Sequence, residues 1–238
     1  MTAPLDLDLD VEAGNWTKAD IDAIENAVRA ALDGAVRDGA LWEEDAAPTD
    51  GTPDKGDGAS LLSIAPVVEV GVRLSDDASV RILNRDYRGK DSPTNVLSFA
   101  ALESADDTAV FMMSSDMPLM LGDIVIARET CEREASEQNK TLINHLVHLT
   151  VHGTLHLVGY DHMVDDEAEE MEELERQILA ALGIDDPYEP IEDQDIETGQ
   201  CTRIVSATTT TRVRALARAG RMVRIPITDP CGEMSHRH

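Results

Sequence analysis

The sequence has few cysteines, and they are too widely spaced to indicate a disulfide or metal-binding pair. Cys131, Cys201 and Cys231 are the three cysteines among 238 residues, and no C-x-x-C pair occurs. Disulfide frameworks and thiolate metal sites are recognised by even-numbered or closely spaced cysteines. The sequence therefore indicates neither a disulfide scaffold nor a zinc site made of thiolates.

Long apolar runs are also lacking. No stretch of about eighteen apolar residues occurs, which is the length that a membrane-spanning helix needs. The opening residues MTAPLDLDLDVE carry acids where a signal peptide has basic and then apolar residues. We therefore expect a soluble, cytoplasmic protein without a membrane partner.

Positive charge is scarce, with 20 Lys and Arg against 47 Asp and Glu and a net charge of −27. Phosphate contacts favour basic surfaces, so this composition argues against nucleic-acid binding. The charge is uneven, because the part from Cys201 onward has a balance of +5 and the rest carries −32. Arg81, Arg85, Arg88 and Lys90 are candidates for a local basic strip. Alternatively, Arg81 and Arg85 belong to a solvated helix face.

Histidine is concentrated in one stretch. Five of the seven histidines lie within 144–162, at positions His145, His148, His152, His156 and His162. The i, i+4, i+8 spacing of His148, His152 and His156 places them on one side of an α-helix. Gly159 is a suitable helix end, after which the chain can double back and bring His162 to face His152 and His156.

The spacing H-x3-H-x5-H is typical of a catalytic zinc site with three protein ligands and one open position. The alternative is that these are core or capping histidines, each satisfied by one hydrogen bond. Several unpaired imidazoles on an apolar helix would be costly to desolvate, and a divalent cation offsets that cost. We predict one Zn²⁺ held by His152, His156 and His162, with nickel, copper or iron as other candidate metals.

The same residues have the layout H-x-x-x-H-x-x-G-x-x-H, which resembles the ligands of the metzincin proteases. Those enzymes carry a glutamate general base beside the first ligand, where this chain has Gly153. Glycine has no side chain to move a proton. The sequence therefore favours a hydrolytic metal site with a different substrate, and a metallopeptidase without the glutamate is the alternative.

The string HGTLHLVGYDH, followed by DDEAEEMEELERQILAALG and preceded by YRGKDSPTNVLSF and LGDIVI, resembles the YbeY family of bacterial endoribonucleases. The resemblance runs from about residue 5 to residue 188. It implies a small mixed sheet flanked by helices. It also implies metal-dependent cleavage of single-stranded RNA in 16S ribosomal RNA 3′-end maturation and ribosome quality control. The family's metal-binding histidines fall on His152, His156 and His162, and its functional arginine falls on Arg88.

The expected roles follow from this site. A metal-bound water attacks a phosphodiester, with His152 and Arg88 as catalytic residues, and Arg88 and Lys90 bind the substrate. His148 and Asp161 are candidates to orient the ligands or to transfer protons, or they make structural hydrogen bonds only. Arg88 could instead form a salt bridge with Asp91. A ribosome-assembly adaptor with a structural metal, bound to the small ribosomal subunit, is the third alternative.

Periodicity and turn residues predict four strands and the helices between and after them, within a single domain over 1–189. The resemblance implies that these elements form an α+β fold, with a mixed four-stranded sheet flanked by helices and a zincin-like metal helix. Strands are expected at 5–11, 67–74, 95–100 and 122–127. Helices are expected after the caps Thr17 and Ser75, from 128, from 142 and from 165. Loop insertions are expected at 46–60 and 103–120, and a disordered Arg- and Thr-rich tail at 190–238.

Overall fold

The computed structural model describes residues 2–41, 60–101, 118–162 and 164–188. The strands are β1 (Leu5–Val11), β2 (Val68–Ser75), β3 (Val96–Ala100) and β4 (Leu119–Ala127). The helices are α1 (Lys18–Asp38), α2 (Leu61–Ile64), α3 (Asp77–Arg88), α5 (Arg128–Glu137), α6 (Leu142–Leu157) and α7 (Asp165–Ala181). Together they form one α+β domain, as predicted.

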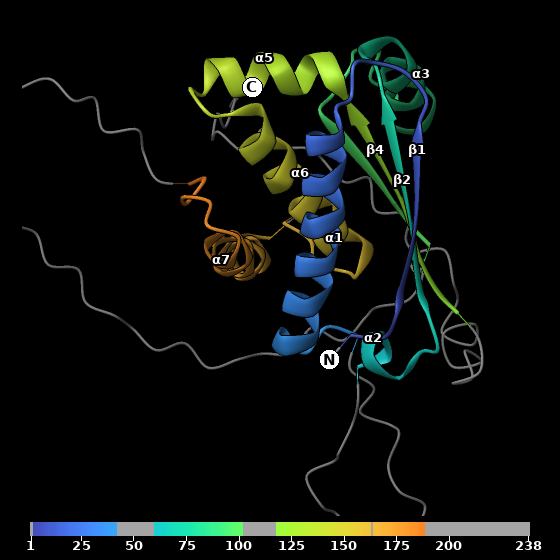
Figure 1. Cartoon of the computed structure of the whole chain (residues 1–238), viewed down its shortest axis with the longest axis vertical. Coiled ribbons are helices and arrows are strands. Elements are labelled where there is room, and N and C mark those ends of the chain that lie inside the picture. The colour runs from blue at the N-terminus through green and yellow to red at the C-terminus, as the bar shows by residue number, and fades with distance from the viewer. Residues whose placement is uncertain (1, 42–59, 102–117, 163, 189–238) are drawn as a thin grey trace, which may run out of the picture.

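The strands form one mixed sheet in the order β1-β2-β4-β3. The β1–β2 and β2–β4 pairs are parallel, and β3 pairs with β4 in the antiparallel direction. Helices α1, α6 and α7 lie on one side of the sheet (Figure 1). This confirms the predicted small mixed sheet flanked by helices.

The core lies between the sheet and these helices. The four alternate residues of β2, which are Val68, Val70, Val72 and Leu74, are at most 2% exposed and point into it. Helix α6 packs on α1, β3 and β4, and its residues from His145 onward are buried with the exception of His152. Each fully buried Leu, Ile or Val side chain contributes about 1.5–3 kcal/mol of hydrophobic stabilisation. The metal helix of the prediction is therefore the central, most buried helix of the domain.

Helix α3 packs on the opposite face of the sheet. Its Val80 contacts a small second cluster with Leu97, Val125 and Ala127. These strand residues alternate with Val96, Ile124 and Ile126, which belong to the main core. Because neighbouring strand residues point to opposite faces, the two helix layers are separated by the sheet. Helix α3 and the histidine helix α6 therefore lie on opposite faces of the sheet.

Two predicted boundaries were wrong. Helix α3 is capped by Asp76, whose Oδ1 accepts from Ser79 N at 2.8 Å, because Ser75 ends β2 and donates its hydroxyl to Glu12. Strand β4 begins at Leu119, so its first two residues do not belong to the predicted 103–120 loop. Gly122 has φ +128° beside a register shift between Glu69 and Val70, and is a bulge inside a longer strand.

Several predicted features lie outside the described residues. These are positions 46–59 of the first loop insertion, 103–117 of the second, and the whole 190–238 tail. Within the described part, no helix is both long enough and apolar enough to span a bilayer.

Candidate metal centre

Local sequence fixes the helix that carries the histidines. Thr141 caps α6 by accepting from Asn144 N at 3.1 Å. At the other end Gly159 has φ +94°, the left-handed conformation that glycine adopts without strain. Tyr160 N then donates back to Leu155 O at 3.1 Å, and Asp161 Oδ1 accepts from His162 N at 2.7 Å. This is the predicted reversal at the end of the helix.

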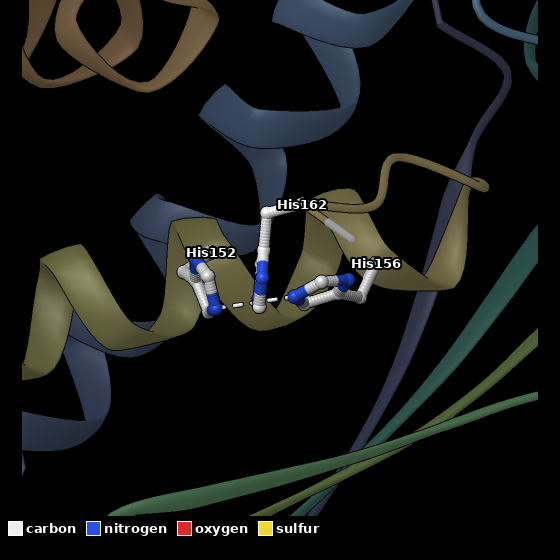
Figure 2. Close-up of side chains that lie close together, drawn as sticks. All are labelled: His152, His156 and His162. Carbon is white, nitrogen blue, oxygen red and sulfur yellow. Dashed lines mark hydrogen bonds between the residues drawn. The ribbon is translucent and has the colours of Figure 1, made fainter. Parts of the chain in front are cut away.

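The reversal brings His152, His156 and His162 together, as Figure 2 shows. Their ring centroids lie 4.6 Å apart for His152–His156, 5.0 Å for His156–His162 and 5.5 Å for His152–His162. Each ring offers one nitrogen, and the three nitrogens all lie within 4.8 Å of one another. These three residues could therefore hold one metal ion.

Hydrogen bonds determine which nitrogen of two of these rings is available. His156 Nδ1 lies 2.8 Å from Tyr160 O, and His152 Nδ1 lies 2.7 Å from Glu175 Oε1. A carbonyl or carboxylate oxygen only accepts, so each Nδ1 carries the proton and each Nε2 of the neutral ring has a free lone pair.

The two Nε2 atoms lie 3.1 Å apart and face each other. Burial is the main cause that lowers the pKa of His156 well below its ordinary value, and electrostatic repulsion from His152 and His162 lowers it further. A proton between the two nitrogens is thereby disfavoured. A cation shared by the two lone pairs relieves their repulsion without protonating the rings. The donor set therefore fits a divalent transition metal.

Glu175 completes the centre from α7, and the sequence analysis missed it. Its side chain is 0% exposed, and it accepts from His152 Nδ1, from His148 Nε2 at 3.1 Å and from Tyr188 Oη at 2.5 Å. Burial alone would raise its pKa, but attraction to His152 and hydrogen bonds from the two histidines outweigh it and hold the pKa well below the ordinary value. One signal was available: Glu175 follows Met171 by four residues and so lies on the apolar face of α7.

The remaining candidate residues have different surroundings. His148 hydrogen-bonds with Glu175, its ring lies edge-on to that of His152 with 6.5 Å between centroids, and its pKa is lowered by burial. Asp161 contacts the backbone of the turn. Arg88 ends α3, and its buried Nη1 has no hydrogen-bond partner among the described residues. Lys90 is exposed. No hydrogen bond within the described ranges joins Arg88 or Lys90 to the three histidines.

The salt bridge considered for Arg88 is made by another arginine. Arg81 donates from Nε and Nη2 to both carboxylate oxygens of Asp91, at 2.8 and 2.9 Å. Arg85 pairs with Asp86 at 2.8 Å, and both arginines are about half exposed. They fit the solvated helix face, whereas Arg88 has no ion pair among the described residues, and burial lowers its pKa.

Gly153 occupies the position of the protease glutamate, and a side chain there would be tightly packed against the sheet. A Cβ at this position would meet Ser98 Oγ at 3.0 Å and methyl groups of Ile124 and Val96 at 3.4 Å. Ser98 also donates to Gly153 O at 3.2 Å. Helix α6 therefore touches the sheet at the place where a metzincin carries its general base.

The fold and the site define a class: small α+β proteins in which a helix end and the turn after it present three histidines to one position. The family profile described as endoribonuclease YbeY matches residues 58–183, which is more than half of the chain. The chain belongs to the YbeY family.

Individual relatives agree. The endoribonuclease YbeY of Paramagnetospirillum magneticum is 48% identical over 79% of this chain and 98% of its own length. That of Rhizorhabdus wittichii is 51% identical over 71% of this chain and 99% of its own length. A solution structure of a Thermotoga maritima protein is 21% identical, with a TM-score of 0.40 over 75% of this chain and 92% of that chain.

Proposed function

We propose that this protein is a metal-dependent endoribonuclease that cleaves single-stranded RNA, acting in 16S ribosomal RNA 3′-end maturation and ribosome quality control. The activity is taken from its relatives, which carry the name endoribonuclease YbeY. The observation that carries the metal dependence is the pair of Nε2 lone pairs facing each other at 3.1 Å, with His162 beside them. The proposed location is the cytoplasm, and the proposed partner is the small ribosomal subunit with its assembly factors.

Zinc is the proposed metal, because three neutral imidazoles are a usual ligand set for catalytic zinc. His152, His156 and His162 would hold it. When bound there, zinc would supply Lewis acidity, which lowers the pKa of water towards neutrality and so would make a nucleophile for a phosphodiester available. Tyr160 O and Glu175 keep the protons of His156 and His152 on Nδ1. The Nε2 lone pairs are thereby kept available.

Arg88 is the proposed contact for the scissile phosphate. It is half-buried, and its Nη1 has no hydrogen-bond partner in the described part of the chain, so it has donors and a positive charge to offer to an anion. An arginine can donate two parallel hydrogen bonds to a phosphate and neutralise charge that develops on its oxygens. Lys90, exposed two residues later, is proposed to contact the RNA backbone.

The peptidase alternative is disfavoured because Gly153 supplies no side-chain base beside the first candidate ligand. The adaptor alternative keeps the metal but not the chemistry. A test uses the purified chain loaded with zinc, a single-stranded RNA, the same RNA in a duplex, and casein. We expect cleavage of the single strand only, and loss of that cleavage on chelation and in His152→Ala. Casein digestion would support the peptidase, and binding to small-subunit particles without RNA cleavage would support the adaptor.

A further inference from the structure

We propose that Glu175 is a positioning residue of the metal centre: it selects which nitrogen of His152 faces the metal. This inference rests on the proposed function, because it requires a metal held by the three histidines. Glu175 lies on α7, 23 residues after His152, and its Oε1 accepts from His152 Nδ1 at 2.7 Å. The opposite nitrogen, Nε2, then points toward His156.

Other histidines of the same helix show that this ring orientation is a consequence of where the carboxylate lies. His145 and His148 also pair with carboxylates, but each does so through Nε2, to Glu134 at 2.9 Å and to Glu175 at 3.1 Å. Both of them keep Nδ1 buried, without a partner among the described residues. Of His145, His148 and His152, only His152 pairs with a carboxylate through Nδ1, and only His152 lines the proposed metal position.

The carboxylate is itself fixed. Its Oε2 accepts from both His148 and Tyr188, so Oε1 is left for His152. The Tyr188 ring is held against His148, with 5.8 Å between centroids and an interplanar angle of 82°. The guanidinium of Arg176 lies over the Tyr188 ring, 5.2 Å from its centroid. Three donors, two from α6 and one from the segment after α7, therefore leave Glu175 one orientation.

The effect on the metal follows from the difference between two ligands. His156 is oriented by the backbone carbonyl of Tyr160, which a substitution does not remove. His152 is oriented by a side chain, so a change at position 175 frees one ligand of three to rotate and to change tautomer. Loss of such an orienting partner weakens metal affinity by about 10–100-fold. Glu175→Gln is the sharpest change, because an amide keeps the shape but loses the charge and one acceptor oxygen.

The test compares Glu175→Gln and Tyr188→Phe with Glu134→Gln as a matched control. Glu134 also pairs with a histidine of α6, but that histidine, His145, is not at the metal position. Zinc affinity is measured by competition with a chromophoric chelator, and the Co²⁺ absorption spectrum reports ligand geometry. We expect Glu175→Gln to bind zinc about 10–100-fold more weakly with an altered spectrum. Tyr188→Phe should show a smaller loss, and Glu134→Gln wild-type affinity.

Nitrogen NMR of the zinc-loaded wild-type chain, with ¹⁵N-labelled histidine, gives a result that does not depend on any variant folding. We expect His152 to bind zinc through Nε2 and to keep its proton on Nδ1. Binding through Nδ1, or wild-type zinc affinity in both Glu175→Gln and Tyr188→Phe, overturns the positioning role. Wild-type zinc affinity in His152→Ala instead overturns the proposed metal site itself.

Discussion

Arg128, the first residue of α5, donates from Nη1 to Oδ2 of Asp20, 108 residues earlier in the chain, at 2.7 Å. Their side chains are only 11% and 5% exposed. Asp20 also completes the capping box of α1 by accepting from Thr17 N at 2.9 Å. One carboxylate therefore starts a helix and ties it to the element that leads into the histidine helix.

Replacing Asp20 by Ala is expected to lower the free energy of unfolding by about 3 kcal/mol, since it removes the buried one of the two carboxylates that pair with Arg128, together with the cap of α1. The exposed Asp22→Ala, which breaks only the surface pair with Lys18, should leave the free energy of unfolding nearly unchanged. Urea unfolding at pH 7 measures both. Equal effects of the two substitutions would contradict the role of the buried pair.

Acid should remove the same contribution in the wild type. Burial would raise the pKa of Asp20, but hydrogen bonds from Thr17 and Arg128 outweigh burial and lower it below its ordinary value of 3.8. A carboxylate whose pKa is lowered in the folded state stabilises the fold above pH 3.8. This stabilisation is lost as the pH falls through the lowered pKa. The wild type should therefore lose more stability than Asp20→Ala on going from pH 5 to pH 2.5, as measured by urea unfolding at each pH.

Metal removal is expected to destabilise the fold as well as to stop RNA cleavage. Zinc at about 100 times its dissociation constant should raise the free energy of unfolding by about 2.7 kcal/mol, because it binds the folded state alone. His162→Ala should lose most of this increase, because one of the three ligands is gone. Thermal unfolding with zinc and with a chelator measures it. An equal zinc effect in His162→Ala would show that the metal binds elsewhere.

Arg88→Ala is expected to lower kcat/KM for single-stranded RNA by about 100-fold, the cost of removing a donor that stabilises developing charge. The matched control is Arg85→Ala, one turn earlier on α3, where the arginine is exposed and already paired with Asp86. That variant should stay within about 3-fold of wild type, as expected for a rim charge. Equal losses in the two variants would indicate general attraction to RNA rather than a specific phosphate contact.

Gly153→Ala tests how tightly α6 packs on the sheet. The added methyl group would meet Ser98 Oγ at 3.0 Å, so we expect a loss of about 1–3 kcal/mol in stability despite the better helix propensity of alanine. Adding Ser98→Ala removes the oxygen that the methyl group meets, and should restore part of the loss. Urea unfolding of the single and double variants measures this coupling; a neutral single variant would show that the packing tolerates a side chain.

The sequence by itself determined the features that depend on neighbouring residues. The spacing of His152 and His156 sets them on one helical face, and Gly159 permits the left-handed end that returns His162 to them. The alternation in β2 and the capping box at Thr17 likewise follow from local geometry. The three clustered histidines could therefore be predicted from short-range patterns, as could the four strands and five of the six helices in the described part of the chain.

Tertiary structure decided the rest, because it depends on how distant elements pack. The bulge at Gly122 exists only against the paired strand β2, so the start of β4 could not be located from its own residues. Glu175 reads as one more acid in an acidic helix until α7 lies against α6 and buries its carboxylate between His148 and His152. Spacing along one helix and the turn after it bring the three histidines together, but the packing of a second helix determines which nitrogen of His152 is free.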